Sequence, residues 1–172
     1  WFPNEEESMS DCPFCQAHRD IDINRIIVNS EHAVAFYDPY IADGYEKSLG
    51  VKRFRSLTDL FSFASIISIH TPFTEETMSM VNQDFINKIN PGSILVNTAR
   101  GKIVESLSVI YKALDLGKLA GVGLDVFEEE PASPDNPLLK LDNVVVTPHT
   151  AGQSDLSHEK QWRLSVETTI SF

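Results

Sequence analysis

The chain has 172 residues, with 14 Lys and Arg against 25 Asp and Glu, which gives a formal net charge of −11. Hydrophobic residues make up 42% and charged residues 23%, so we expect a packed core and exclude a chain that is disordered throughout. The acidic balance repels phosphate backbones and anionic lipid, and no apolar stretch approaches the roughly 18 to 20 residues that span a bilayer. These features predict a cytoplasmic protein without nucleic-acid or membrane partners.

The first 37 residues contain three sequence patterns that predict local structure or chemistry. Residues 1–11 are polar and acidic without periodicity, which predicts a disordered leader. Residues 25–28 and 33–37 are β-like runs separated by a four-residue turn signal, which predicts an antiparallel β-hairpin. Between leader and hairpin, Cys12 and Cys15 form a C-x-x-C pair. The spacing is consistent with half of a tetrahedral zinc site, with a free or redox-labile thiol pair, or with a vestigial element of the hairpin.

From residue 38 onward, apolar runs alternate with helical patterns, which is typical of βαβ units on a parallel sheet. The apolar runs are nearly continuous, as expected for strands covered on both faces. Strands are predicted at residues 65–69, 93–97, 121–126 and 144–147. Helices are predicted after the capping residues Ser56 and Asn82, over residues 107–114 with Gly117 as the stop, and over residues 154–170.

Polar motifs follow several of these strands. They are Asp38-Pro39-Tyr40, His70-Thr71-Pro72 with Thr74 and Thr77, residues 96–101 (VNTARG), residues 123–127 (GLDVF) with Glu130-Pro131, and residues 147–152 (TPHTAG). In this order the motifs resemble the nucleotide-binding domain of the D-isomer-specific 2-hydroxyacid dehydrogenases, and the resemblance covers residues 37–172. It implies an α/β fold with a Rossmann-like parallel sheet and flanking helices, and NAD-dependent oxidation of a 2-hydroxy acid or reduction of a 2-oxo acid.

The chemistry of such a reaction explains the residue types at three positions. A histidine that titrates near neutrality can take the hydroxyl proton and return it, and His149 is the candidate. The resemblance implies that Glu130 is the carboxylate that stabilises the protonated imidazolium and sets the tautomer of the neutral ring. Arg100 can hold the substrate carboxylate with two parallel hydrogen bonds, which lysine cannot reproduce.

The resemblance also implies a set of residues that contact NAD. Asp38 would accept hydrogen bonds from the adenosine ribose, which favours NAD over NADP, and Asp125 would face the nicotinamide carboxamide. The complete set comprises Asp38, His70, Thr71, Pro72, Thr77, Thr98, Ala99, Asp125 and Gly152.

The sequence departs from the family at its first strand. A G-x-G-x-x-G loop, which holds the pyrophosphate at a helix N-terminus, is absent, and Gly121-Val122-Gly123 lies inside a predicted strand. We also find no counterpart of the family's substrate domain, and therefore expect an incomplete or inactive fragment. The alternative is a non-catalytic fragment that binds nucleotide or serves in assembly.

Residues 12–16, 25–28 and 31–36 resemble instead the opening of histidine triad proteins, which act on nucleotide phosphates. That family's H-x-H-x-H motif is absent, since no two of the 5 histidines are two positions apart. A zinc-binding remnant remains as another alternative. The resulting division is a leader at residues 1–11, a histidine-triad-like hairpin at 12–36 and a partial NAD-binding domain at 37–172, joined as a chimera near residues 36–38.

The junction poses a topological problem. In the order 3-2-1-4-5-6 the family's first strand lies at the centre of the sheet. A four-residue connection allows only an antiparallel neighbour, because a parallel one needs a crossover of about a dozen residues. We therefore expect either a repacked sheet or association with a second copy as a homodimer.

Overall fold

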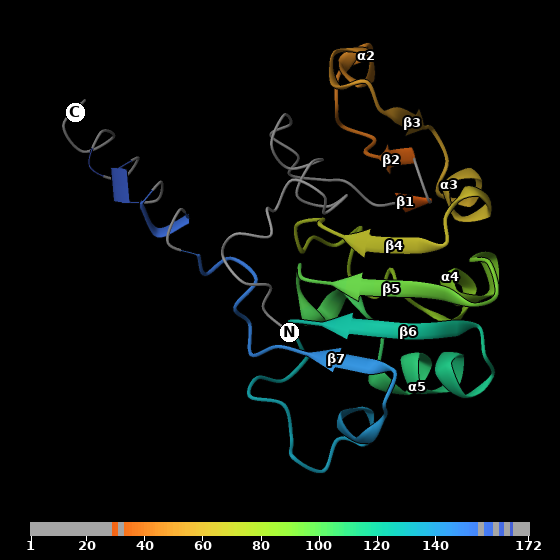
Figure 1. The fold of residues 1–172 in the computed structure, drawn as a ribbon, viewed down its shortest axis with the longest axis vertical. Coiled ribbons are helices and arrows are strands. Elements are labelled where there is room, and N and C mark those ends of the chain that lie inside the picture. Colours follow the sequence, from red (N-terminus) through yellow and green to blue (C-terminus); the bar gives the residue numbers. More distant parts are fainter. Residues whose placement is uncertain (1–28, 31–32, 155–156, 160–161, 164–165, 167–172) are drawn as a thin grey trace, which may run out of the picture.

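The computed structural model describes residues 29–30, 33–154, 157–159, 162–163 and 166. Within these residues the strands form one seven-stranded sheet in the order β3-β2-β1-β4-β5-β6-β7 (Figure 1). The strands are β1 (Asn29–Ser30), β2 (Ala33–Tyr37), β3 (Lys52–Phe54), β4 (Ile66–Ile69), β5 (Ser93–Asn97), β6 (Leu119–Leu124) and β7 (Val144–Val146). The helices are α2 (Tyr45–Leu49), α3 (Leu57–Phe63), α4 (Gln83–Lys88) and α5 (Leu107–Asp115), with 3₁₀ turns η1 (Gly101–Ile103) and η2 (Pro137–Lys140). The α/β fold class predicted from the sequence is confirmed.

A two-residue antiparallel strand, β1, is the third of the seven strands and lies between β2 and β4. It pairs with β2 through Asn29↔Val34 and Ser30↔Ala33, and with β4 through Asn29↔Ile66. The predicted antiparallel partner of residues 33–37 is confirmed, but the predicted four-residue turn is wrong, because its first two residues, Asn29 and Ser30, pair with β2. Residues 25–28 of the predicted first strand lie outside the described residues. Within one chain, β1 keeps the sheet continuous.

All other neighbouring strands are parallel. β2 pairs with β3, and β4 to β7 pair in sequence order. The carboxyl ends of β4 to β7 therefore lie along one edge of the sheet (Figure 1). In open α/β sheets this edge is where ligands bind.

Local sequence signals account for the helix ends. The Ser56 Oγ accepts a hydrogen bond from the Thr58 N–H at 3.2 Å, and the Asn82 Oδ1 accepts one from the Phe85 N–H at 3.0 Å. Both predicted caps are confirmed, and each satisfies a donor at a helix start. Gly117, at φ 66°, follows α5 in a left-handed conformation that glycine adopts without strain.

One strand is displaced from its predicted position. β6 spans Leu119–Leu124 rather than residues 121–126. The Asp125 N–H still donates to the Asn97 carbonyl at 3.0 Å, and the Asp125 side chain accepts a hydrogen bond from the loop after β7. In the predicted C-terminal helix, residues 157–159, 162–163 and 166 are helical, and the remaining residues of that helix between 155 and 170 lie outside the described part of the chain.

The core lies between the sheet and its helices. Fully buried members include Leu60, Ile67, Leu95, Ile110 and Leu138. The rings of Phe61 and Phe85 meet edge to face at 4.5 Å between centroids, which packs α3 against α4. In the part of the chain that the structure describes, no helix is long and apolar enough to cross a membrane.

Candidate active site

The candidate residues gather at the carboxyl edge of the sheet. Asp38 follows β2, His70 follows β4, Arg100 lies in the loop after β5, Asp125 follows β6 and His149 lies in the loop after β7. Strand pairing therefore brings to one edge residues that are more than 100 positions apart in the sequence (Figure 1).

His149 and Glu130 form a hydrogen-bonded pair. His149 Nδ1 lies 2.7 Å from Glu130 Oε2, and both side chains are partly exposed. The second carboxylate oxygen, Glu130 Oε1, accepts a hydrogen bond from the Phe127 N–H at 3.0 Å. The hydrogen bond to His149, and then that from Phe127, hold the pKa of Glu130 below its ordinary value. Glu130 is therefore ionised near neutrality and fixes the imidazole through Nδ1.

Asp125 secures the loop that carries His149. It is 3% exposed. Its carboxylate accepts hydrogen bonds from the Thr147 hydroxyl and from the Thr150 and Ala151 N–H groups, at 2.8 and 2.9 Å for the two amides. Burial raises the pKa of Asp125, but these hydrogen bonds outweigh burial and leave the pKa below its ordinary value. The His149 N–H also donates to the Asp125 carbonyl at 2.9 Å.

The loop that carries Arg100 is held by Asn97, which is fully buried. Asn97 Oδ1 accepts from the Ala99 N–H, and Asn97 Nδ2 donates to the Arg100 carbonyl, each at 3.0 Å. The Arg100 side chain is exposed and donates from Nη1 to the Ala99 carbonyl at 2.6 Å. One of the five guanidinium donors is engaged in this bond, and the others can reach a ligand.

Gly101 joins this loop to the Glu130 loop. A Cβ at Gly101 would lie 1.9 Å from the Phe127 carbonyl carbon and oxygen and 2.4 Å from the Glu128 nitrogen. Only glycine allows the two backbones to approach this closely. The distance between the segments that carry Arg100 and Glu130 therefore depends on Gly101.

A pocket of about 660 Å³ lies beside the ends of β2 and β4. Five predicted cofactor residues line it, namely Asp38, His70, Thr71, Pro72 and Thr77. Asp38, Glu75 and Glu76 give it an acidic wall. Thr77 Oγ1 donates to the Pro72 carbonyl at 2.7 Å and accepts from the Thr74 N–H at 2.8 Å, so Thr77 also stabilises the lining loop. The hydroxyl of Thr71 is buried and has no hydrogen-bond partner in the described part of the chain.

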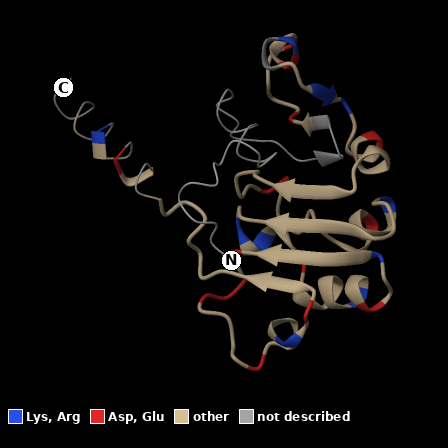
Figure 2. Ribbon diagram, viewed as in Figure 1, with Lys and Arg blue, Asp and Glu red and all other residues tan. Residues whose placement is uncertain are grey.

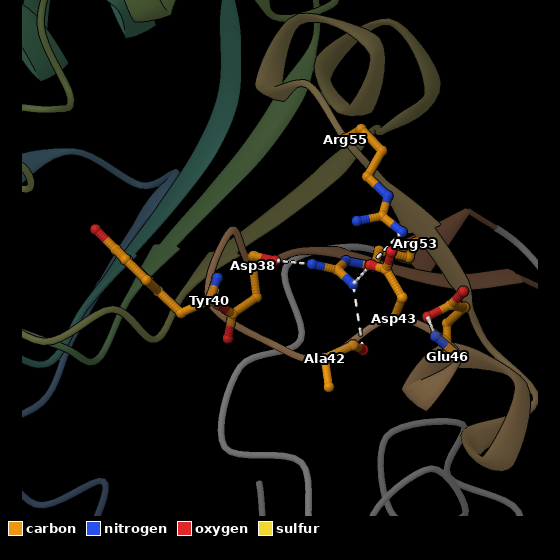
Figure 3. Close-up of polar contacts among 8 residues, drawn as sticks. Asp38, Tyr40, Ala42, Asp43, Glu46, Arg53 and Arg55 are labelled. Carbon is orange, nitrogen blue, oxygen red and sulfur yellow. Dashed lines mark hydrogen bonds and ion pairs between the residues drawn. The ribbon is translucent and has the colours of Figure 1, made fainter.

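Arg53, on β3, anchors the loop after Asp38 (Figure 3). Its side chain is 4% exposed. Nη2 donates to the Asp38 carbonyl at 2.8 Å, while Nη1 contacts the Ala42 carbonyl at 3.3 Å and Asp43 Oδ1 at 3.2 Å. Arg55 also pairs with Asp43 at 2.7 Å but is 60% exposed. Figure 2 shows this basic strand at the opposite end of the sheet from the acidic Glu130 loop.

The remaining cofactor candidates lie farther along the same edge. Ala99 is 8% exposed, and Thr98 precedes it in the loop after β5. Gly152 is exposed, and an added Cβ would meet nothing within 4 Å, so the chain itself does not require glycine there. Cys12 and Cys15 lie outside the described residues. Among the residues described, no group of three or more His, Cys, Asp and Glu is placed to hold a metal ion.

Sequence reasoning missed the supporting roles of four residues: Asn97, Gly101, Thr147 and Arg53. Asn97, Gly101 and Thr147 belong to the motifs at residues 96–101 and 147–152, and for Asn97 and Thr147 a polar residue closing an apolar strand is a signal that could have found the role. Arg53 gives no such signal, because its partners come from a loop that only the folded chain brings near.

Comparison with known proteins identifies the family. Residues 22–151 match the family model described as "D-isomer specific 2-hydroxyacid dehydrogenase, NAD binding domain". A glyoxylate reductase of Korarchaeum cryptofilum is 42% identical over 139 residues, which cover 81% of this chain and 41% of that protein. A D-3-phosphoglycerate dehydrogenase of Archaeoglobus fulgidus is 43% identical over 124 residues, covering 72% of this chain and 23% of that protein. The chain thus spans less than half the length of these relatives.

Solved structures agree with this match. The apo form of D-mandelate dehydrogenase from Rhodotorula graminis superposes with a TM-score of 0.69 at 34% identity, covering 77% of this chain and 38% of that one. A D-lactate dehydrogenase from Aquifex aeolicus, complexed with NAD and lactic acid, superposes with a TM-score of 0.67 at 35% identity, covering 80% of this chain and 45% of that one.

The family match begins at residue 22 and so includes the hairpin. These matches give no support to the resemblance of residues 12–36 to histidine triad proteins. The sheet order, the motifs at its carboxyl edge and the similarity over most of the chain agree with one another. The chain belongs to the D-isomer specific 2-hydroxyacid dehydrogenases and corresponds to their NAD-binding domain.

Proposed function

We propose that the chain binds NAD at the carboxyl edge of its sheet and supplies the residues for hydride exchange between NAD and a small 2-hydroxy or 2-oxo acid. The observation that carries this proposal is the 2.7 Å contact between His149 Nδ1 and Glu130 Oε2, next to the buried Asp125. A histidine oriented by an ionised carboxylate at the ligand-binding edge of an α/β sheet is suited to proton transfer.

The pocket beside β2 and β4 fits the adenosine half of the cofactor. Asp38 follows β2 directly and lines the pocket, where it would accept hydrogen bonds from the ribose hydroxyls. The acidic wall formed with Glu75 and Glu76 opposes an additional phosphate on that ribose, which favours NAD over NADP. This chain has no G-x-G-x-x-G loop, which in the family binds the pyrophosphate. We assign the nicotinamide half to Thr98, Ala99, Asp125 and Gly152.

The chain's own residues account for the proton and the substrate carboxylate. Bound NAD would supply the acceptor for the hydride that leaves the substrate carbon. Because Glu130 engages Nδ1, Nε2 of His149 is the nitrogen that receives the hydroxyl proton during oxidation and returns it during reduction. The Glu130 carboxylate stabilises the resulting imidazolium. Arg100 binds the substrate carboxylate with its remaining guanidinium donors.

Calorimetric titration with NADH tests the cofactor site. We expect binding tighter than about 1 mM, equivalent to −4.1 kcal/mol. Asp38→Ala should weaken binding, whereas Asp59→Ala, which removes the same charge from an exposed position on α3, should not. Absence of binding by a chain that circular dichroism shows to be folded would refute the proposal.

Turnover separates an enzyme from a non-catalytic fragment. With NADH and a 2-oxo acid such as glyoxylate, we expect the isolated chain to work at least several orders of magnitude slower than a full-length relative, since positioning alone supplies about 7 to 11 kcal/mol. Residual turnover should disappear in Arg100→Ala. NADH binding without any turnover would instead establish the non-catalytic alternative.

Two finer proposals concern other parts of the chain. Cys12 and Cys15 would hold zinc as remnants of a histidine-triad-like segment, which metal analysis of the purified chain tests against a Cys12→Ser, Cys15→Ser variant. Association as a homodimer is tested by sedimentation. The assignment of residues 12–36 and 37–172 to separate ancestors remains a prediction.

A further inference from the structure

A second pocket lies between α5 and the loop that follows β6. Its volume is about 550 Å³, a size typical of ligand-binding clefts. α5 supplies part of the lining, and residues 127–129, 132–133 and 135–137 of the loop supply the rest. None of the predicted catalytic or cofactor residues lines this pocket, so it is separate from the candidate active site.

The pocket has an apolar lining that includes an exposed aromatic ring. Leu107 and Tyr111 are one helical turn apart on α5, so their side chains lie on the same face of the helix. Phe127 and Ala132 complete this lining from the loop. Phe127 is only 8% exposed, whereas Tyr111 is 40% exposed. Tyr111 therefore presents apolar surface that a bound partner can cover.

The rim of the pocket is acidic. It has the exposed carboxylates of Glu128, Glu129 and Asp135 and one exposed ammonium group, that of Lys112. Among the residues that the structure describes, no hydrogen bond or ion pair engages these four side chains. The neighbouring Glu130, by contrast, uses both carboxylate oxygens in hydrogen bonds. The rim thus has a net charge of −3 + 1 = −2 that is available to a cationic partner.

Charge decides which kind of partner fits this pocket. A second copy of the chain has a net charge of −11 and is repelled, as are nucleic acid and anionic lipid. The basic strand β3 of a second copy does not change this, because Arg55 already pairs with Asp43 at 2.7 Å. A protein segment with Lys or Arg on both sides of a large apolar residue matches the apolar lining and the acidic rim together.

We propose that this pocket is a docking site for such a basic segment of a partner protein. The apolar side chain of the segment enters between α5 and the loop and covers the ring of Tyr111. Its flanking cations pair with Glu128, Glu129 and Asp135. Because exposed ion pairs contribute little affinity, the apolar side chain supplies most of it, and the rim charges select basic partners and speed their association.

Phe127 connects the docking site to the candidate active site. Its side chain lines the pocket, and its N–H donates to Glu130 Oε1 at 3.0 Å. A bound segment therefore contacts a residue that holds the partner of His149, and the Phe127 amide is a natural NMR reporter of binding. The docking site itself does not depend on the proposed NAD binding.

Peptide titration tests the proposal. The probes are end-blocked pentapeptides of the sequence Arg-Lys-X-Lys-Arg with Phe, Trp or Leu at X, titrated calorimetrically at low ionic strength. We expect at least one to bind more tightly than about 1 mM. The peptide with Gly at X, which lacks the apolar side chain, and the peptide with Glu in place of every Lys and Arg should each bind at least about tenfold more weakly.

Variants of the chain show where the peptide binds. Glu128→Gln with Glu129→Gln removes two rim charges and should weaken binding about tenfold. The matched control, Asp59→Asn with Asp115→Asn, removes two exposed charges that do not line the pocket and should leave binding unchanged. On binding, NMR shifts of the unaltered chain should concentrate in α5 and residues 127–137.

Four outcomes would overturn the docking site. They are no binding of any probe by the folded chain, equal binding of the Gly peptide, equal losses in the rim and control variants, and NMR shifts centred on the acidic cofactor pocket. The second would show that charge alone attracts the peptide. The last would place the peptide at Glu75 and Glu76 instead. NADH is absent from all these experiments, so their failure is distinct from failure of the proposed function.

Discussion

His149 has a left-handed backbone conformation, with φ 56°. This conformation is uncommon for residues other than glycine, although histidine is among the enriched types. Two hydrogen bonds hold it: the His149 N–H donates to the Asp125 carbonyl, and Nδ1 contacts Glu130. The position of His149 therefore depends on residues 24 and 19 positions earlier in the chain (149 − 125 and 149 − 130).

Glu130 titration provides a test at the residue scale. The hydrogen bond to His149 is the largest cause of the lowered Glu130 pKa, so His149→Asn should raise that pKa towards its ordinary value of 4.5. The Phe127 N–H remains as a donor, so a smaller depression should persist. NMR titration of the Glu130 carboxyl carbon measures the change, and His158→Asn, an exposed histidine elsewhere, is the control. An unchanged Glu130 pKa in His149→Asn would contradict the pairing.

At the scale of elements, the loops after β5 and β6 meet at Gly101. In Gly101→Ala the new methyl group would overlap the Phe127 carbonyl, and backbone cannot move aside as a flexible side chain can. We expect a loss of unfolding free energy on the order of 3 kcal/mol. Gly152→Ala is the matched control, with an expected effect within about 0.5 kcal/mol, since its Cβ meets nothing within 4 Å. Urea unfolding measures both, and equal effects would count against the close approach.

Arg53 anchors the loop after β2 to the neighbouring strand β3. Arg53→Lys keeps the charge but cannot span the Asp38 carbonyl, the Ala42 carbonyl and the Asp43 carboxylate together. We expect a loss of about 2 kcal/mol, because the buried side chain at position 53 loses hydrogen bonds and the buried Asp38 carbonyl loses its donor. Arg55→Lys, at a 60% exposed position, should change stability by less than about 0.5 kcal/mol. If urea unfolding showed no difference between the two variants, Arg53 would not be the anchor.

For the whole molecule, the predictable parts of the fold are those with local signals. The apolar runs located β4 and β5, and Ser56 and Asn82 identified two helix starts. β3 escaped prediction because a three-residue strand with two basic residues has no apolar pattern. The motifs indicated which side chains gather at the carboxyl edge, but the supporting contacts of Gly101 and Arg53 join segments that only tertiary structure brings together.

The pH dependence of stability is a property of the whole molecule, because two opposing effects contribute to it. Asp125, Glu130 and Asp43 have lowered pKa values in the folded chain; Asp43 owes this first to its hydrogen bond from Arg55. Such groups contribute stability that is complete above their ordinary values of 3.8, 4.5 and 3.8 and is lost as pH falls through the folded values. Against this, acid relieves the repulsion associated with a net charge of −11.

We expect the hydrogen-bonded carboxylates to outweigh the repulsion, since surface charges are screened within about 8 Å at physiological salt whereas Asp125 is only 3% exposed. The free energy of unfolding should therefore change little from about pH 7 to 5 and fall below about pH 4.5. Asp125→Asn should have lower stability at neutral pH and a shallower acid dependence, because its unfolded state has one fewer carboxylate to protonate. Urea unfolding across this range tests both, with the exposed Asp115→Asn as control. A stability that rises towards pH 3.5 would mean that charge repulsion outweighs the Asp125 hydrogen bonds.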